Sequence, residues 1–233
     1  MQLALSALSS HLQSAAQKGL RPIYVLYGDE ALLQLEAADA IRATAKQLGF
    51  TERTVFTVQG AHFDWSEVLS TGQSMGLFGD KQMVDIRIPT GKPSKEGSVA
   101  LQQMAQSAAD NDSTLTLISL PRLDKATQTS AWFSALEGAG ASIKIDTVER
   151  NALPQWIAQR LGQQGQRVAE GAQGQQALQF FADCVEGNLM AAFQEIQKLA
   201  LLYPQGELSL AQIEAAVLNV ARRSEERRVG KEC

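Results

Sequence analysis

Cysteine and histidine are scarce in this chain, which has two of each among 233 residues. Two cysteines, Cys184 and Cys233, are too few for a disulfide framework, so a reducing cytoplasm is the expected location. The two histidines, His11 and His62, have no ligand spacing to each other or to Cys184, so we expect no metal site. These shortages argue against a disulfide-stapled scaffold and against a histidine-based metal centre.

Long apolar runs and an excess of basic charge are also missing. No apolar run approaches the length that spans a bilayer, so we expect no membrane partner. Residues 1–17 have no basic residue before their apolar positions, and their pattern favours an amphipathic helix over a secretion signal. The formal net charge of −4 argues against electrostatic binding of DNA or RNA by the chain as a whole. A local basic patch that binds nucleic acid is still compatible with this charge.

Strand-like and helix-like patterns alternate up to about Asp146. Residues 23–27 form a continuous apolar run, which is typical of a strand buried on both faces. Apolar residues at 84, 86 and 88 alternate with Asp85 and Arg87, which predicts a strand that is covered on one face. Further strands are predicted at 55–58, 115–118 and 143–145, with helices between them. Such alternation predicts an α/β domain over residues 1–147, built on a mainly parallel sheet.

The strand signal disappears from Asn151 onward. Short helices joined by brief Gly-containing turns predict a small helical bundle over residues 148–222. Residues 223–233 then break the pattern with dense mixed charge and almost nothing to bury. We interpret them as a non-native-looking tail and leave them out of the fold prediction. A basic nucleic-acid tail is the alternative, which the interleaved glutamates disfavour.

An α/β domain followed by a helical domain suggests an ATPase, and the sequence argues against one. A phosphate-binding loop needs Gly-x-x-x-x-Gly-Lys-[Ser/Thr] between a strand and a helix. At that position residues 27–32 read Tyr-Gly-Asp-Glu-Ala-Leu, with one glycine and no lysine. Asp29 and Glu30 at the helix N-terminus complement its dipole themselves and repel an anion. We therefore expect no ATP binding, no ATP hydrolysis and no nucleotide cofactor.

Other catalytic patterns are equally poor. There is no Gly-x-Ser-x-Gly elbow and no Gly-x-Gly-x-x-Gly fingerprint. Asp64 and Glu67 could form a carboxylate pair, but Asp64 is better explained as a helix cap. Cys184 is better explained as a buried structural thiol than as a nucleophile. Arg122 and Lys125 could touch a phosphate backbone, although such residues more often form a solvated rim. We expect no catalytic residue, cofactor or metal on this chain.

The most distinctive local feature is an apolar cluster framed by glycines at 72, 76 and 79. Met75, Leu77 and Phe78 lie close together in sequence, directly before a predicted strand. One interpretation is that they are buried in the hydrophobic core beneath that strand. The other is that they enter a partner's groove, where burial of a Leu or Phe side chain contributes roughly 1.5–3 kcal/mol.

Several motifs, each weak alone, occur together in a fairly specific order and spacing. They are Tyr-Val-Leu-Tyr-Gly-Asp-Glu at 24–30, Ser-Met-Gly-Leu-Phe at 74–78, Leu-Asp-Lys-Ala at 123–126 leading to Ala-Trp-Phe at 131–133, and Glu-Gly-Asn-Leu at 186–189. On these motifs, residues 20–220 resemble the δ subunit of the bacterial DNA polymerase III clamp loader.

This resemblance implies an AAA+-like domain that has lost nucleotide binding, a helical lid, and a collar domain that this chain lacks. It also implies that the protein binds the sliding clamp (beta subunit) and opens its ring through a short helix. The clamp-binding positions of the family fall on Met75, Leu77 and Phe78. The implied partners of the complete protein are the delta prime and gamma/tau subunits, with primed DNA reached through the complex. The family is a component of a DNA-directed DNA polymerase (nucleotidyltransferase) complex, in which partner subunits use the ATP.

Three alternatives stay open. The first is a nucleotide-free AAA+-like adaptor of another assembly. The second is a small-molecule α/β enzyme with its site at the carboxyl ends of the strands. The third is a direct DNA-binding module, whose affinity would depend steeply on salt.

Overall fold

The computed structural model describes residues 1–60, 63–73 and 81–217. The chain separates into two compact units, Met1–Thr147 and Val148–Cys233. Within the described residues, no helix combines the length and the apolar character needed to cross a bilayer.

A six-stranded parallel sheet forms the centre of the first unit, with the strand order β1-β6-β2-β5-β4-β3. The strands are β1 (Gln2–Leu3), β2 (Ile23–Gly28), β3 (Phe50–Thr57), β4 (Lys81–Arg87), β5 (Thr114–Leu120) and β6 (Ala141–Ile145). Parallel neighbours need crossover connections, which the intervening helices supply. The predicted α/β class with a parallel sheet is confirmed.

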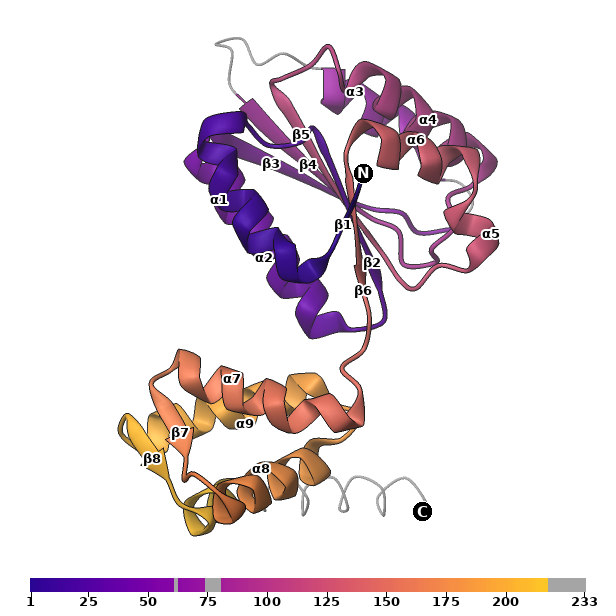
Figure 1. Ribbon diagram of the computed structural model, residues 1–233. Coiled ribbons are helices and arrows are strands. Elements are labelled where there is room, and N and C mark those ends of the chain that lie inside the picture. Colours follow the sequence, from indigo (N-terminus) through magenta and orange to yellow (C-terminus); the bar gives the residue numbers. More distant parts are fainter. Residues whose placement is uncertain (61–62, 74–80, 218–233) are drawn as a thin grey trace. The chain divides into compact units, whose positions relative to one another are not determined.

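Helices cover both faces of this sheet (Figure 1). One face carries α1 (Leu8–Lys18) and α2 (Ala31–Gln47), and the other carries α3 (Trp65–Gln73), α4 (Lys95–Ser107) and α6 (Ala131–Ala139), with the short α5 (Lys125–Gln128) between α4 and α6 in sequence. A 3-10 turn at Leu5–Ala7 precedes α1. The N-terminal segment is therefore a short strand, a turn and a helix, where the sequence predicted one helix.

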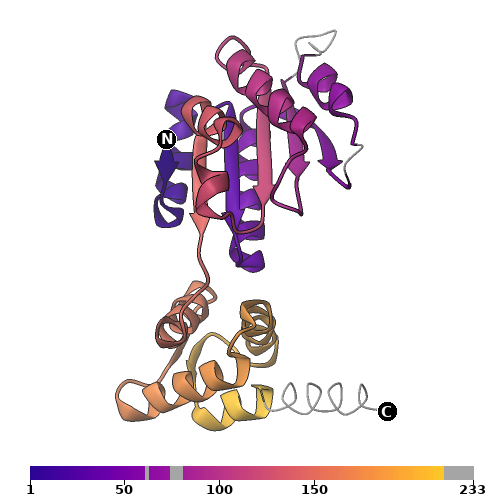
Figure 2. The same ribbon diagram turned by 90° about the vertical axis from the view of Figure 1, so that its right-hand side faces the viewer.

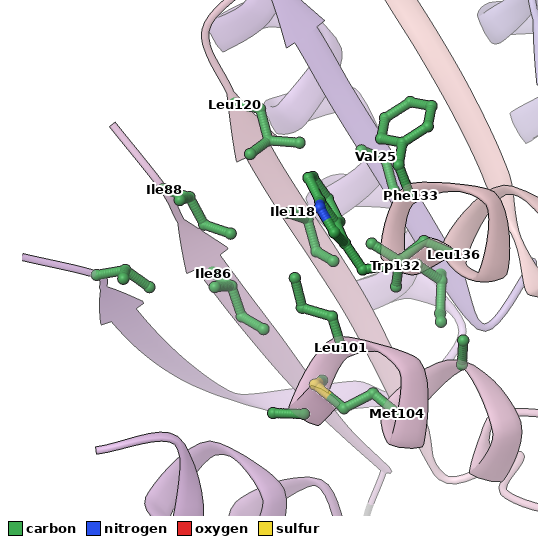
Figure 3. Packing of buried hydrophobic residues seen from close by; sticks show 14 of the residues in the cluster. Val25, Ile86, Ile88, Leu101, Met104, Ile118, Leu120, Trp132, Phe133 and Leu136 are labelled. Carbon is green, nitrogen blue, oxygen red and sulfur yellow. The ribbon is translucent and has the colours of Figure 1, made fainter. Parts of the chain in front are cut away.

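Alternate residues of β2 supply two separate cores, which explains its continuous apolar run. Val25 and Tyr27 pack on the α4 and α6 side, whereas Tyr24 and Leu26 pack on the α1 and α2 side. Figure 3 shows the first core, where strand residues face the α4 and α6 side chains Leu101, Met104, Trp132, Phe133 and Leu136. Because strands in such a sheet are buried on both faces, their sequences lose the usual alternation.

The prediction that β4 is covered on one face only was wrong. Residues Met83–Ile86 are all buried, and Asp85 has no solvent exposure. Arg42 of α2 and Arg53 of β3 both bind the Asp85 carboxylate, at 2.8 and 2.6 Å. Two cations from neighbouring elements thus make it possible to bury a charged residue that the sequence pattern placed in solvent.

Three helices, α7 (Leu153–Gln163), α8 (Ala172–Val185) and α9 (Leu189–Leu202), pack on one another in the second unit (Figure 2). A 3-10 turn at Arg150–Ala152 leads into α7, and residues 210–217 are helical. Their buried side chains include Ile157, Phe181 and Ile196. The mainly helical character expected from the sequence is present, while the tail at 223–233 lies outside the described residues.

The described residues of the second unit also include two strands, so the predicted loss of all strands after Asn151 was wrong. β7 (Gln166–Val168) and β8 (Gly206–Leu208) pair in parallel. The buried Gln166 side chain donates to the carbonyls of Leu199 and Tyr203, at 3.1 and 3.0 Å, and so joins this small sheet to the end of α9. Strands of three residues are too short to show a period-2 pattern, which is why the sequence does not reveal them.

Candidate functional site

The three predicted partner-binding residues, Met75, Leu77 and Phe78, lie outside the described residues. The structure does describe the elements on either side of them in sequence. α3 ends at Gln73, and β4 begins at Lys81. Any site formed by residues 74–80 is therefore attached to the first unit through the last turn of α3 and the first residues of β4.

The N-terminal half of α3 packs against α4, and a capping residue stabilises its first turn. Trp65 is buried, and a Cβ atom on Gly97 of α4 would come within 2.6 Å of its indole ring, so the two helices approach closely at a glycine. Phe63 packs edge-to-face on Trp65, with ring centroids 5.2 Å apart. Asp64 accepts hydrogen bonds from the backbone N–H and the hydroxyl of Ser66, which lower the pKa of Asp64. Asp64 therefore acts as a cap at the start of α3 and is accounted for without a catalytic role.

Side chains from outside α3 hold its C-terminal end. Asn111 Nδ2 donates to the Gly72 carbonyl at 3.0 Å, and Thr114 Oγ1 donates to the same oxygen at 3.2 Å. Gln82 Nε2 donates to the Thr71 carbonyl at 2.6 Å. The last carbonyls of a helix have no partner within the helix, and here neighbouring elements supply the donors. Sequence reasoning missed all three residues, because nothing local relates Asn111 or Thr114 to a helix some forty residues earlier.

The position where a related ATPase would hold phosphate is the turn between β2 and α2. Gly28 lies against β6, where a Cβ atom would come within 1.8 Å of the Ile145 carbonyl oxygen. Close packing of the backbone therefore accounts for this glycine without any phosphate. Glu30 caps α2 by accepting the Leu32 N–H at 3.4 Å, and burial raises the pKa of Glu30. Asp29 lies 3.6 Å from the guanidinium of Arg122.

Gln34 occupies the crevice beside this turn. Its Nε2 donates to the carbonyls of Leu26 on β2 and Leu120 on β5, at 3.2 and 2.8 Å. A neutral amide thus joins the two strands at the carboxyl edge of the sheet, where open α/β folds place their ligands. Asp29 and Glu30 at the start of α2 disfavour a nucleotide phosphate at this helix end, and the nearby Arg122 is paired with Asp29.

The remaining described candidates, His11 and Cys184, belong to different units. His11 Nε2 hydrogen-bonds Tyr24 Oη at 2.9 Å, and burial together with Arg21 lowers the pKa of His11. Cys184 is half-buried on α8, and burial and Asp183 raise the pKa of its thiol, which disfavours the thiolate. In the part of the chain that the structure describes, no three His, Cys, Asp or Glu side chains converge as metal ligands. His62 and Cys233 lie outside that part.

The family described as "DNA polymerase III, delta subunit" matches residues 24–145 of the chain. The DNA polymerase III subunit delta of Escherichia coli (strain K12) is 32% identical over 210 residues, which cover 90% of this chain and 59% of that protein. The protein of the same name from Haemophilus influenzae is 28% identical over 205 residues, covering 86% of this chain and 56% of that protein. The chain therefore spans less than two thirds of the length of these relatives.

Solved structures with a similar fold include the Bacillus subtilis DNA clamp loader delta protein, with a TM-score of 0.63 and 19% identity over 89% of this chain and 61% of that one. Domain III of the Thermotoga maritima replication initiation protein DnaA has a TM-score of 0.53 and 14% identity, covering 92% of this chain and 91% of that one. At these identities the similarity concerns the fold alone. The AAA+-like α/β fold expected from the sequence is thereby confirmed.

Proposed function

The chain belongs to the DNA polymerase III delta subunit family, and on that premise we propose that it binds the sliding clamp and opens its ring during DNA replication. In this proposal the clamp is loaded onto primed DNA by a complex that contains this protein. In the same proposal the protein works with the delta prime and gamma/tau subunits, and ATP is used by partner subunits of the complex.

Family membership is the observation that carries this proposal, together with the apolar cluster at the positions where the family binds its clamp. Met75, Leu77 and Phe78 are the anchors we assign to the clamp pocket. The attachment of α3 and β4 to the rest of the first unit supports this assignment, because a firmly held base lowers the cost of ordering a binding segment. The carboxyl edge of the sheet adds indirect support. Its acidic turn and Gln34 disfavour nucleotide binding, which agrees with a clamp-binding role rather than an ATPase role for this chain.

We propose that ring opening follows from differential affinity. A clamp whose subunit interface opens transiently exists as closed and open forms in equilibrium. If the apolar anchors bind the open form more tightly, the equilibrium shifts toward it by that difference in binding free energy and no more. No covalent step takes place on this chain. The division into an AAA+-like domain at 1–147 and a helical lid at 148–222 belongs to the same proposal.

Ring opening can be measured directly with the sliding clamp of the same organism. Two dyes are placed across one subunit interface so that they quench each other while the ring is closed, and the full chain is added. We expect fluorescence to rise with the wild-type chain and to stay at baseline with the Leu77→Ala/Phe78→Ala double variant.

The matched control is Val99→Ala, which removes an exposed apolar side chain from α4, where Val99 is 49% exposed. This variant should open the clamp as well as the wild type does. If the double variant opened the clamp as well as the wild type does, the proposed role of residues 77 and 78 would be contradicted. The absence of any opening by the wild-type chain would remove the proposed function itself.

A further inference from the structure

Three side chains around the end of α3 form one hydrogen-bonded group. Asn111 lies in the loop after α4, Thr114 is the first residue of β5, and Gln82 is the second residue of β4. Gln82 and Thr114 are direct neighbours across the β4–β5 pair, and Gln82 N–H donates to the Ser113 carbonyl at 2.8 Å. The group therefore belongs to the edge of the sheet at which β4 and β5 begin.

The hydroxyl of Thr114 connects the two amide side chains. It accepts from Asn111 Nδ2 at 3.2 Å and from Gln82 Nε2 at 3.3 Å, while its own proton goes to the Gly72 carbonyl. Asn111 Nδ2 uses its second proton on Gly72 as well. All three side chains are partly buried, so these hydrogen bonds are less open to replacement by water than surface contacts are.

The acceptors are two consecutive carbonyls, those of Thr71 and Gly72, in the last turn of α3. Exposed helix ends usually leave such carbonyls to water or to a local cap. Here the donors come from the starts of two strands and the loop before one of them. The end of α3 is therefore fixed to β5 and to β4, the strand in which the chain re-enters the sheet at Lys81.

We propose that Asn111, Thr114 and Gln82 are positioning residues for clamp binding. They hold the point where the chain leaves α3 and the point where it enters β4 at one edge of the sheet, which sets the direction from which residues 74–80 meet the clamp. Binding then costs less conformational entropy than it would if the helix end were free to fray. This inference rests on the proposed function, since it assigns a role to residues that do not themselves contact the clamp.

Asn111→Asp separates the positioning contact from local folding. The Asn111 Oδ1 atom accepts the Ser113 N–H and hydroxyl at 3.1 and 2.7 Å, and an aspartate keeps both of these bonds. It loses only the Nδ2 donor and turns a carboxylate oxygen toward the Gly72 carbonyl. Asn188→Asp is the matched control, because Asn188 caps α9 as an acceptor of the Ala191 N–H at 2.9 Å, a role that aspartate also fills.

Thr114→Val and Thr114→Ser form a second, uncharged pair. Valine removes the hydroxyl, and serine keeps it. Clamp affinity is measured by titrating the full chain with purified clamp, at a temperature where each variant is fully folded by circular dichroism. We expect Asn111→Asp and Thr114→Val to weaken binding about 3- to 10-fold, because each removes one hydrogen bond to the Gly72 carbonyl, while Thr114→Ser and Asn188→Asp bind like the wild type.

The Leu77→Ala/Phe78→Ala double variant is titrated in the same series to keep the two proposals distinguishable. If it fails to bind while Asn111→Asp and Thr114→Val bind like the wild type, the positioning role is wrong and the proposed function stands. If the double variant binds like the wild type, the proposed clamp contact is wrong and the positioning role falls with it. Equal weakening by Thr114→Val and Thr114→Ser also overturns the inference, because the hydroxyl is then not what matters.

Discussion

Arg42 of α2 and Asp85 of β4 form an ion pair of 2.8 Å in which the carboxylate is fully buried. Arg53 of the edge strand β3 reaches the same Oδ2 atom at 2.6 Å, so one oxygen serves two guanidinium groups. Within the described residues, no donor reaches the other oxygen, Oδ1. A helix and an edge strand are thus joined to β4 through a single atom, in the strand that directly follows the proposed clamp-binding segment.

The Asp85→Asn variant should be destabilised, because it leaves Arg42 and Arg53, whose side chains are 16% and 38% exposed, facing a neutral amide at a fully buried position. Breaking a buried pair by neutralising one partner costs about 3–5 kcal/mol. Asp39→Asn is the control, since Asp39 also pairs with Arg42, at 2.7 Å, but is 62% exposed. Its loss should cost less than about 1 kcal/mol. Urea unfolding measures both, and similar losses in the two variants would contradict the structural role of Asp85.

Two helical glycines should respond oppositely to substitution by alanine. A Cβ atom at Gly97 would lie 2.6 Å from the buried Trp65 ring, whereas nothing lies within 4 Å of a Cβ atom at Gly138 of α6. We expect Gly97→Ala to cost about 1–3 kcal/mol through overpacking. Gly138→Ala should be neutral or stabilising by about 0.5 kcal/mol, because alanine favours the helix. Thermal unfolding distinguishes the two, and an unchanged midpoint for Gly97→Ala would contradict the close approach of α3 and α4.

The free energy of unfolding should fall on mild acidification, and part of this loss should come from His11. Burial and Arg21 lower the pKa of His11 below its ordinary value of 6.5, so the folded state binds the proton less readily than the unfolded chain. The stabilising contribution is complete above pH 6.5 and is lost as the pH falls from there toward the lowered folded value. Urea unfolding between about pH 7.5 and about pH 5.5 should therefore show a shallower loss in His11→Gln than in the wild type. Parallel pH profiles would contradict this account of His11.

The fold was largely predictable because β2, α2 and β5 carry strong local patterns. The apolar run at 23–27 and the helical spacing after it match β2 and α2 closely. The very short strands β7 and β8 were not predictable, since their hydrogen bonds depend on segments some forty residues apart. The burial of Asp85 escaped prediction for a similar reason, because its two arginines come from other elements.

The candidate site also contains residues that the sequence predicts and residues that it does not. Met75, Leu77 and Phe78 stand out in the sequence as a local apolar cluster, and their clamp-binding role stays a prediction. Asn111 and Thr114 carry no such signal. They are ordinary polar residues whose importance comes from the Gly72 carbonyl that both of them reach. Polar contacts between distant segments are set by the tertiary fold and leave no periodic pattern in the sequence.

The most direct test of the central claim is a residue-by-residue titration of the sliding clamp against alanine variants of residues 74–80. If Met75, Leu77 and Phe78 are the anchors, alanine at Leu77 or Phe78 should weaken binding about 30-fold or more, as hot-spot residues do, and alanine at Met75 should also weaken it. Alanine at Ser74 or Asp80 should change affinity little. Wild-type affinity in all three apolar variants would contradict the account.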